Sequence, residues 1–187
     1  ISLFGSVDII VHNAGIAQRS NAIDTQTEVE RKIMEVDYFS YTELTRCILP
    51  YFLTQKKGHI VVVSGLLADI HLPGRSSYAA AKAALLGYFG CLRAELTSSN
   101  IDVTVLIPGS LQTDLVNKAL DKNGNVVTSN TEKVGCSLDK AASQAIKSIY
   151  EKKYQTYIGE KDKAFIMWKV SKWFPNFAVK KLLKTFQ

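Results

Sequence analysis

A tyrosine and a lysine, Tyr78 and Lys82, stand four residues apart in a stretch with helical character. Residues with this spacing lie on the same face of a helix. A tyrosine hydroxyl ordinarily has a pKa of about 10, so proton exchange near pH 7 requires a shift worth about 4 kcal/mol. A neighbouring ammonium group supplies part of that shift because it stabilises the phenolate. The pair is therefore a candidate acid/base site, although Tyr157 and Lys161 repeat the spacing.

Small residues stand at the ends of three apolar runs, where a ligand could approach the backbone. They are Asn13-Ala14-Gly15, Ser64-Gly65 and Pro108-Gly109. Ligands of an open parallel sheet bind at the carboxyl ends of its strands, and small residues permit close approach there. Any one of these segments is explained by a tight turn. Three of them in successive units predict a crevice, and Tyr78 begins the helix that follows the second.

The surrounding chain alternates between short apolar runs and longer stretches with helical periodicity. The runs are rich in Val and Ile, as expected for strands buried on both faces of a parallel sheet: Val7–Val11, His59–Val63 and Ile101–Ile107. Helices are predicted over Glu28–Phe52, Ser76–Thr97 and Leu138–Tyr150, with a further strand at Tyr154–Ile158. In the first helix, one apolar stripe is expected to face the core: Ile33, Val36, Leu44, Ile48 and Phe52. This alternation predicts an α/β fold.

The composition is that of an ordinary globular domain. The chain has 187 residues, 47% of them hydrophobic, which is enough to bury a core without disulfides or metal. No apolar run is long enough to cross a bilayer as a helix. The chain begins at Ile1 without an initiator Met, which favours a processed product or a partial sequence. Cys47, Cys91 and Cys136 match no metal or redox spacing, so we expect no metal site and three free, buried thiols.

The C-terminal part carries the whole net charge of +6, because residues 151–187 hold nine lysines and only three acidic residues. Residues 163–187 are predicted as a basic amphipathic tail in two helical pieces broken at Pro175, after a domain at 1–162. The second piece has an apolar and a basic face: Val179, Leu182, Leu183 and Phe186 against Lys180, Lys181 and Lys184. Three interpretations stay open: a membrane-surface contact, a helix closing the pocket, and a homodimer surface. The neutral remainder argues against nucleic acid.

Three motifs together resemble those of the short-chain dehydrogenase/reductase family. Asn13-Ala14-Gly15, Tyr78-x-x-x-Lys82 and Pro108-Gly109-x-x-x-Thr113 occur in the family's order and spacing. The flanking sequence is most similar to the branch with dehydrogenase/reductase member 7 and the 11-beta-hydroxysteroid dehydrogenases: Val36-Asp37-Tyr38-Phe39, Leu49-Pro50, Gly58-His59-Ile60-Val61 and Cys91-Leu92-Arg93-Ala94-Glu95-Leu96. The resemblance implies a Rossmann-like doubly wound parallel sheet, of which this chain holds the C-terminal portion from the family's fourth strand onward.

The resemblance also implies an activity, a cofactor and a location. The activity is the NAD- or NADP-dependent interconversion of an alcohol and a carbonyl in a lipophilic small molecule such as a steroid or retinoid. Tyr78 would exchange a proton with the substrate oxygen, and Lys82 would lower the pKa of that tyrosine and bind the nicotinamide ribose. The other cofactor-binding residues would be Asn13, Ala14, Gly15, Pro108, Gly109, Leu111 and Thr113. Many members of this branch are membrane-associated, which favours the endoplasmic reticulum over the cytoplasm.

Three features depart from the family pattern. The glycine-rich turn that would hold the pyrophosphate is absent, and so is the part of the family that contains it. The position of the catalytic serine is Gly65, and the neighbouring Ser64 is expected to point to the opposite face of the strand. The position of the active-site asparagine is Asp37, whose carboxylate could pair with Lys82 and weaken its effect on Tyr78.

Two hypotheses therefore stand side by side. The intact motifs favour an oxidoreductase, and the changes at Gly65 and Asp37 favour a non-catalytic relative that still binds a dinucleotide or a partner. A serine hydrolase is excluded, because the sequence has no Gly-x-Ser-x-Gly elbow.

Overall fold

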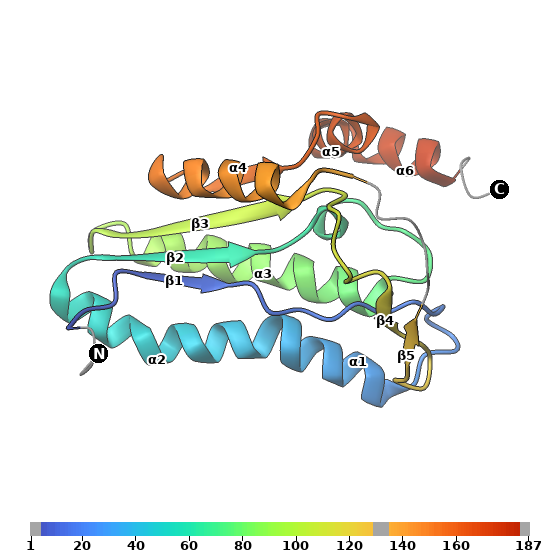
Figure 1. The fold of residues 1–187 in the computed structure, drawn as a ribbon, viewed down its shortest axis with the longest axis horizontal. Coiled ribbons are helices and arrows are strands. Elements are labelled where there is room, and N and C mark those ends of the chain that lie inside the picture. Colours follow the sequence, from blue (N-terminus) through green and yellow to red (C-terminus); the bar gives the residue numbers. More distant parts are fainter. Residues whose placement is uncertain (1–4, 129–134, 184–187) are drawn as a thin grey trace.

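The fold is a parallel sheet with helices on both faces, as predicted. The computed structural model describes residues 5–128 and 135–183, with side chains up to residue 180. Its main sheet has the order β1-β2-β3-β6, and every neighbouring pair is parallel. The strands are β1 (Ile9–His12), β2 (Gly58–Val63), β3 (Ile101–Pro108) and β6 (Gln155–Ile158). In Figure 1 the arrowheads of β1, β2 and β3 point the same way, so their carboxyl ends meet at one edge.

Different helices cover the two faces of the sheet. One face packs against α2 (Ser40–Gln55) and α3 (Ser76–Glu95), with a core that includes Phe52, Ile60 and Phe89, and α1 (Thr27–Met34) packs against α3. The other packs against α4 (Leu138–Tyr150) through Val61, Leu106 and Ile158. A short antiparallel pair, β4 (Lys118–Leu120) and β5 (Val126–Thr128), lies beyond the carboxyl ends of the strands. Backbone hydrogen bonds join it to the segment that follows β1 (Figure 1).

The prediction that the first strand is buried on both faces is wrong. Ile9 and Val11 are 48% and 53% exposed, whereas Val61, the register partner of Val11 on β2, is fully buried. The reason is position. β1 is the edge strand of the described sheet. The cluster of side chains that packs against α4 includes residues of β2, β3 and β6 but none of β1.

The predicted helix over Glu28–Phe52 is interrupted by a π-helical turn, η1 (Glu35–Phe39), between α1 and α2. A π turn holds more residues than an α turn, so it changes which downstream residues face the core. Ile33 and Phe52 are buried as predicted, but Leu44 is 55% exposed, and the prediction for it is wrong. The same turn directs Asp37 inward, where it is fully buried.

The C-terminal segment forms two helices, as predicted: α5 (Lys163–Trp173) and α6 (Pro175–Leu183), which begins at the proline. α5 is joined to the loop after β2. Trp168 is 9% exposed, and its Nε1 donates a hydrogen bond of 2.7 Å to Asp69 Oδ2. In the predicted amphipathic piece, Val179 is exposed. The side chains of Lys181, Leu182 and Leu183, and the whole of Lys184 and Phe186, lie outside the described residues.

Two further observations concern the thiols and membrane insertion. Cys136 is buried as predicted, but Cys47 and Cys91 are exposed, so the prediction for those two is wrong. Within the described ranges, no helix is both long enough and apolar enough to cross a membrane.

The turn from α2 into β2 depends on a glycine. A Cβ built on Gly58 would overlap the ring of Phe52, which is fully buried and cannot move aside. The substitution Gly58→Ala is therefore expected to lower the free energy of unfolding by about 1–3 kcal/mol, the usual cost of overpacking a core. Chemical denaturation of the complete protein measures it.

Gly87 in α3 is the matched control. Nothing lies within 4 Å of a Cβ built there. Replacing a glycine with alanine in a helix interior stabilises by about 0.5–1 kcal/mol. Equal effects of Gly58→Ala and Gly87→Ala would contradict the packing described for Phe52.

Candidate active site

The ends of β1, β2 and β3 enclose a cavity of about 570 Å³, which confirms the predicted crevice. Eight of the predicted site residues line it: Asn13, Gly15, Tyr78, Lys82, Pro108, Gly109, Leu111 and Thr113. Ala14 is not among its lining residues, and its carbonyl oxygen instead accepts a hydrogen bond from the Tyr41 hydroxyl. The strand ends supply the small residues, and the first two turns of α3 supply Tyr78 and Lys82.

An ion pair between Lys82 and Asp37 lies at the inner wall of this cavity. Nζ of Lys82 is 3.0 Å from Oδ2 of Asp37, and the two side chains are 4% and 0% exposed. The other carboxylate oxygen, Oδ1, accepts a hydrogen bond of 2.8 Å from the backbone N–H of Ile16. A Cβ on Gly15 would lie 3.2 Å from Oδ2, so a small residue is needed beside the pair. The direct Asp37–Lys82 pairing considered from the sequence is therefore present.

Burial and the Asp37 charge together determine the protonation of the site. Burial raises the pKa of Asp37 and lowers the pKa of Lys82, and the attraction between the two groups opposes both shifts. Burial also raises the pKa of Tyr78, and the nearby Asp37 carboxylate raises it further. The charge of Arg75 acts in the opposite direction. Burial and the Asp37 charge together outweigh the charge of Arg75, so the pKa of Tyr78 lies above its ordinary value.

Position 65 faces the tyrosine directly. A Cβ built on Gly65 would lie 3.5 Å from the Tyr78 hydroxyl oxygen, an ordinary van der Waals distance. The backbone at Gly65 is extended, with φ of 179°, so a serine fits there without strain. Ser64 points elsewhere: its hydroxyl is buried and donates a 2.8 Å hydrogen bond to the carbonyl oxygen of Lys82. Ser64 therefore does not replace the missing hydroxyl.

The second tyrosine–lysine pair lies outside the cavity. The Tyr157 ring packs against Phe165 and Trp168, with centroids 4.9 and 5.5 Å away, and its hydroxyl lies against Gly109. Burial raises the pKa of Tyr157 to about 12. A Cβ on Gly109 would overlap that hydroxyl, which explains why glycine follows Pro108. Of the two Tyr-x-x-x-Lys pairs, Tyr78 and Lys82 line the cavity, whereas Tyr157 packs among aromatic rings.

Three residues that the sequence did not single out also shape the site. Tyr41 holds the Ala14 carbonyl and stacks on His12, with ring centroids 5.1 Å apart. Gln18 is fully buried, and its side-chain oxygen accepts a 3.0 Å hydrogen bond from the backbone N–H of Ser77 at the start of α3. Arg75 lines the cavity three residues before Tyr78. Its position one helical turn before Tyr78 is the only signal in the sequence that could have drawn attention to any of the three.

The described residues contain no cluster of His, Cys, Asp or Glu that could hold a metal ion. The predicted residues thus form one mostly apolar cavity with a neutral phenol, a buried ion pair and small residues at three strand ends.

The comparison with a family model agrees with this geometry. Residues 1–124 match the model described as short chain dehydrogenase. Among solved structures, a short-chain dehydrogenase from Streptomyces avermitilis superposes with a TM-score of 0.78 at 23% identity, over 98% of this chain and 72% of its own. A 4-hydroxyisoleucine dehydrogenase mutant, complexed with NADH and succinate, superposes with a TM-score of 0.57 at 27% identity, over 59% of this chain and 46% of its own.

Curated relatives identify the branch. Dehydrogenase/reductase SDR family member 7B of Rattus norvegicus is 42% identical over 144 residues, which is 77% of this chain and 42% of the relative. The Bos taurus protein of the same name is 35% identical over 86% of this chain and 50% of itself. Member 7 of Homo sapiens is 42% identical over 63% of this chain and 35% of itself. The chain spans about half the length of these relatives or less. It belongs to the short-chain dehydrogenase/reductase family, in the branch of members 7 and 7B.

Proposed function

We propose that the complete protein is an NAD- or NADP-dependent oxidoreductase that interconverts an alcohol and a carbonyl. The observation that carries the proposal is the placement of Tyr78 and Lys82 beside the small residues of three strand ends in one cavity. The family membership supports it, and so does the NADH bound to the 4-hydroxyisoleucine dehydrogenase mutant.

The residues at the strand ends fit a nicotinamide cofactor. Gly15, Gly65 and Gly109 line the cavity without side chains that could fill it, and no carboxylate is among the described residues that line it. Lys82 would bind the ribose and Asn13 and Gly15 would line the cofactor, with Ala14 acting only through the backbone between them, while Pro108, Gly109, Leu111 and Thr113 would contact the nicotinamide end. The cofactor supplies the hydride, and the protein supplies position and electrostatics.

Tyr78 is the proposed proton donor and acceptor of the reaction. In carbonyl reduction, the neutral hydroxyl donates its proton to the substrate oxygen, which leaves a phenolate. The Lys82 ammonium and the Arg75 guanidinium stabilise that phenolate, whereas the Asp37 carboxylate 3.0 Å from Lys82 offsets much of the lysine charge. Since Gly65 offers no second donor to the reacting oxygen, we infer a slow enzyme.

The apolar walls of the cavity suit a lipophilic substrate. Leu66, Leu67, Leu72, Leu115 and Val116 line the cavity, and they support a steroid, a retinoid or another apolar molecule as the substrate class.

The second candidate function is a non-catalytic relative that binds a dinucleotide or a partner. Two observations favour it. Position 65 has no hydroxyl to face Tyr78, and Asp37 neutralises the lysine that the proton transfer depends on.

Restoring the two residues of the family pattern separates these functions. Gly65→Ser with Asp37→Asn is expected to raise kcat for carbonyl reduction by about 10²–10³, because it adds one donor to the reacting oxygen and removes an opposing charge. Stopped-flow or steady-state oxidation of NADPH and NADH by the complete protein measures the change.

Three controls make the result specific. Gly65→Ala adds the Cβ without the hydroxyl and should give no gain. The gain should disappear when Tyr78→Phe is added and persist when Tyr157→Phe is added. If the double variant binds NADPH or NADH but reduces no carbonyl, the chain is a binding protein and the enzyme proposal is wrong.

We also propose that residues 163–187 attach the protein to an anionic membrane surface, at the endoplasmic reticulum rather than in the cytoplasm. Large apolar side chains at the junction of α5 and α6 support this, since Trp173, Phe174 and Phe177 are 82%, 66% and 59% exposed. Three lysines flank them in the sequence, Lys169, Lys172 and Lys180, and this mixture of aromatic and basic residues suits the membrane interface.

Vesicle binding tests the membrane proposal. The variant Trp173→Ser/Phe174→Ser/Phe177→Ser should bind phosphatidylserine vesicles at least about tenfold more weakly than the parent, since each lost apolar contact weakens insertion. Binding of the parent should fall as salt is raised. Tyr150→Ser, which removes an 87% exposed side chain on α4, is the control and should leave binding unchanged. Equal partitioning of parent and triple variant would remove the proposal.

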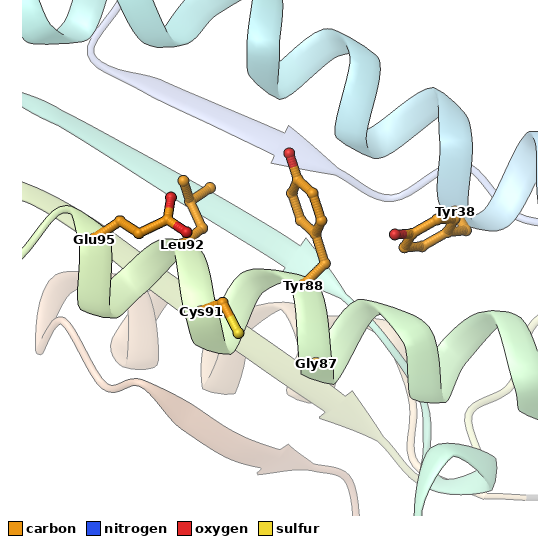
Figure 2. Close-up of a pocket in the computed structure, with 6 residues that line it drawn as sticks. All are labelled: Tyr38, Gly87, Tyr88, Cys91, Leu92 and Glu95. Atoms are coloured by element: carbon orange, nitrogen blue, oxygen red, sulfur yellow. The ribbon is translucent and has the colours of Figure 1, made fainter.

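We further propose a homodimer that forms across α3 and η1. A groove of about 290 Å³ lies there, and Figure 2 shows Tyr88 and Leu92 pointing from α3 toward the side where Tyr38 enters from η1. The two tyrosine rings meet edge to face, with centroids 6.2 Å apart. Phe39 is exposed and its ring meets that of Tyr38, with centroids 5.1 Å apart, so it extends the apolar surface beside the groove.

A charge placed in the groove tests the dimer. Cys91 is exposed and lines the groove, so Cys91→Arg is expected to convert a dimer to a monomer in light scattering coupled to size-exclusion chromatography. Ile146→Arg changes a 65% exposed residue on α4, on the other face of the sheet, and should leave the mass unchanged. A parent that is monomeric at all concentrations would contradict the proposal.

A further inference from the structure

The cavity walls carry an unbalanced positive charge. Two cations line the cavity, Lys82 and Arg75, and none of the described lining residues is acidic. Asp37 does not line the cavity, but its carboxylate neutralises Lys82, with Nζ and Oδ2 3.0 Å apart. Arg75 has no carboxylate within ion-pair distance among residues 5–128 and 135–180. An arginine beside apolar walls, partly withdrawn from water, is costly unless an anion meets it.

The backbone holds this guanidinium in a fixed place. Nη1 of Arg75 donates a 2.5 Å hydrogen bond to the carbonyl oxygen of Gln18, and Gln18 is itself fully buried. The side chain of Gln18 is tied in turn to the backbone N–H of Ser77 at 3.0 Å. One nitrogen of the guanidinium is therefore used for positioning, which leaves its other donors available to a ligand.

The surroundings of Arg75 add to the positive potential. Arg75 is the N-cap residue of α3, a helix of 20 residues with no acidic residue in its first turn. The amino end of a helix carries partial positive charge. Burial and the neighbouring Arg19 both lower the pKa of Arg75, and Tyr78 raises it. An anion placed next to Arg75 would stabilise its guanidinium, the neighbouring Arg19 and the amino end of α3.

We infer that Arg75 determines substrate specificity by binding a carboxylate on an otherwise apolar substrate. The inference rests on the proposed function, since it places the reacting carbon at Tyr78. Arg75 precedes Tyr78 by one helical turn, so a carboxylate at the guanidinium and a carbonyl at the phenol belong to one small molecule. The rest of that molecule packs against Leu66, Leu67 and Leu72. The substrate class is therefore an aliphatic or aromatic oxo acid, or the matching hydroxy acid.

Binding of a simple carboxylate tests the inference without any turnover. Sodium octanoate is titrated into the complete protein by calorimetry, and 1-octanol is titrated as its uncharged counterpart. Arg75→Gln keeps a donor for the Gln18 carbonyl but removes the charge. It is expected to weaken octanoate binding by about 10- to 100-fold, the range for a lost charge-assisted hydrogen bond, and to leave octanol binding unchanged.

Two matched variants exclude a structural cause. Arg75→Lys retains the cation and should recover part of the octanoate affinity. Arg19→Gln removes the neighbouring exposed charge and should change the affinity by less than about threefold, because a solvent-exposed charge is screened. If the parent binds no octanoate, or if Arg75→Gln weakens octanoate and octanol equally, the inference is wrong.

The kinetic counterpart separates this inference from the proposed function. An oxo acid and its methyl ester are compared as substrates. Arg75→Gln should raise KM for the acid and not for the ester, whereas a fall in kcat from the lost stabilisation of the Tyr78 phenolate should be the same for both. If the parent reduces no carbonyl compound but binds octanoate through Arg75, the proposed function is wrong and the anion site stands. If the parent reduces acid and ester with equal kcat/KM, the enzyme stands and the role of Arg75 is overturned.

Discussion

The buried ion pair between Asp37 and Lys82 is the interaction on which the site depends. Both side chains are almost completely withdrawn from water, so each charge is stable only because the other lies 3.0 Å away. The backbone N–H of Ile16 satisfies a further lone pair of the carboxylate and joins the pair to the segment after β1. Removing either partner alone leaves the other charge buried without its counter-charge, so a variant such as Asp37→Asn must be checked for stability as well as for activity.

The two charges of this pair act in opposite directions on the ionisation of Tyr78. Lys82 lies 5.5 Å from the centre of the tyrosine ring and favours the phenolate, but the carboxylate of Asp37 opposes it and burial adds to the opposition. An active site with asparagine at position 37 would not meet this conflict, because an amide carries no charge. Gly65 is the second difference from the family pattern, because a glycine provides no side-chain hydroxyl beside that of Tyr78. Under the proposed function, the cavity would still accept a cofactor and substrate, whereas the raised pKa of Tyr78 and the absence of a hydroxyl at position 65 would slow the proton transfer.

Much of this arrangement was predictable from the sequence, because strand ends in a parallel sheet must meet at one edge. The small residues after three apolar runs and the spacing of Tyr78 and Lys82 located the cavity. What the sequence could not indicate depends on contacts between distant segments. The π turn at Glu35–Phe39 changes which residues face inward, and no local pattern marks it. Arg75 has an ordinary position before a helix, and only the fold brings it beside the cavity. The exposure of Val11 follows from its place at the sheet edge, which a strand's own composition does not reveal.

The edge strand β1 has one more consequence. Among the described residues, its main-chain N–H and C=O groups are paired on the β2 side alone, and two apolar side chains beside them are open to water. Such an edge is a template onto which another extended segment can add by backbone hydrogen bonds. The described sheet can therefore be extended at β1, on the side farthest from β6, by any segment that offers a matching strand.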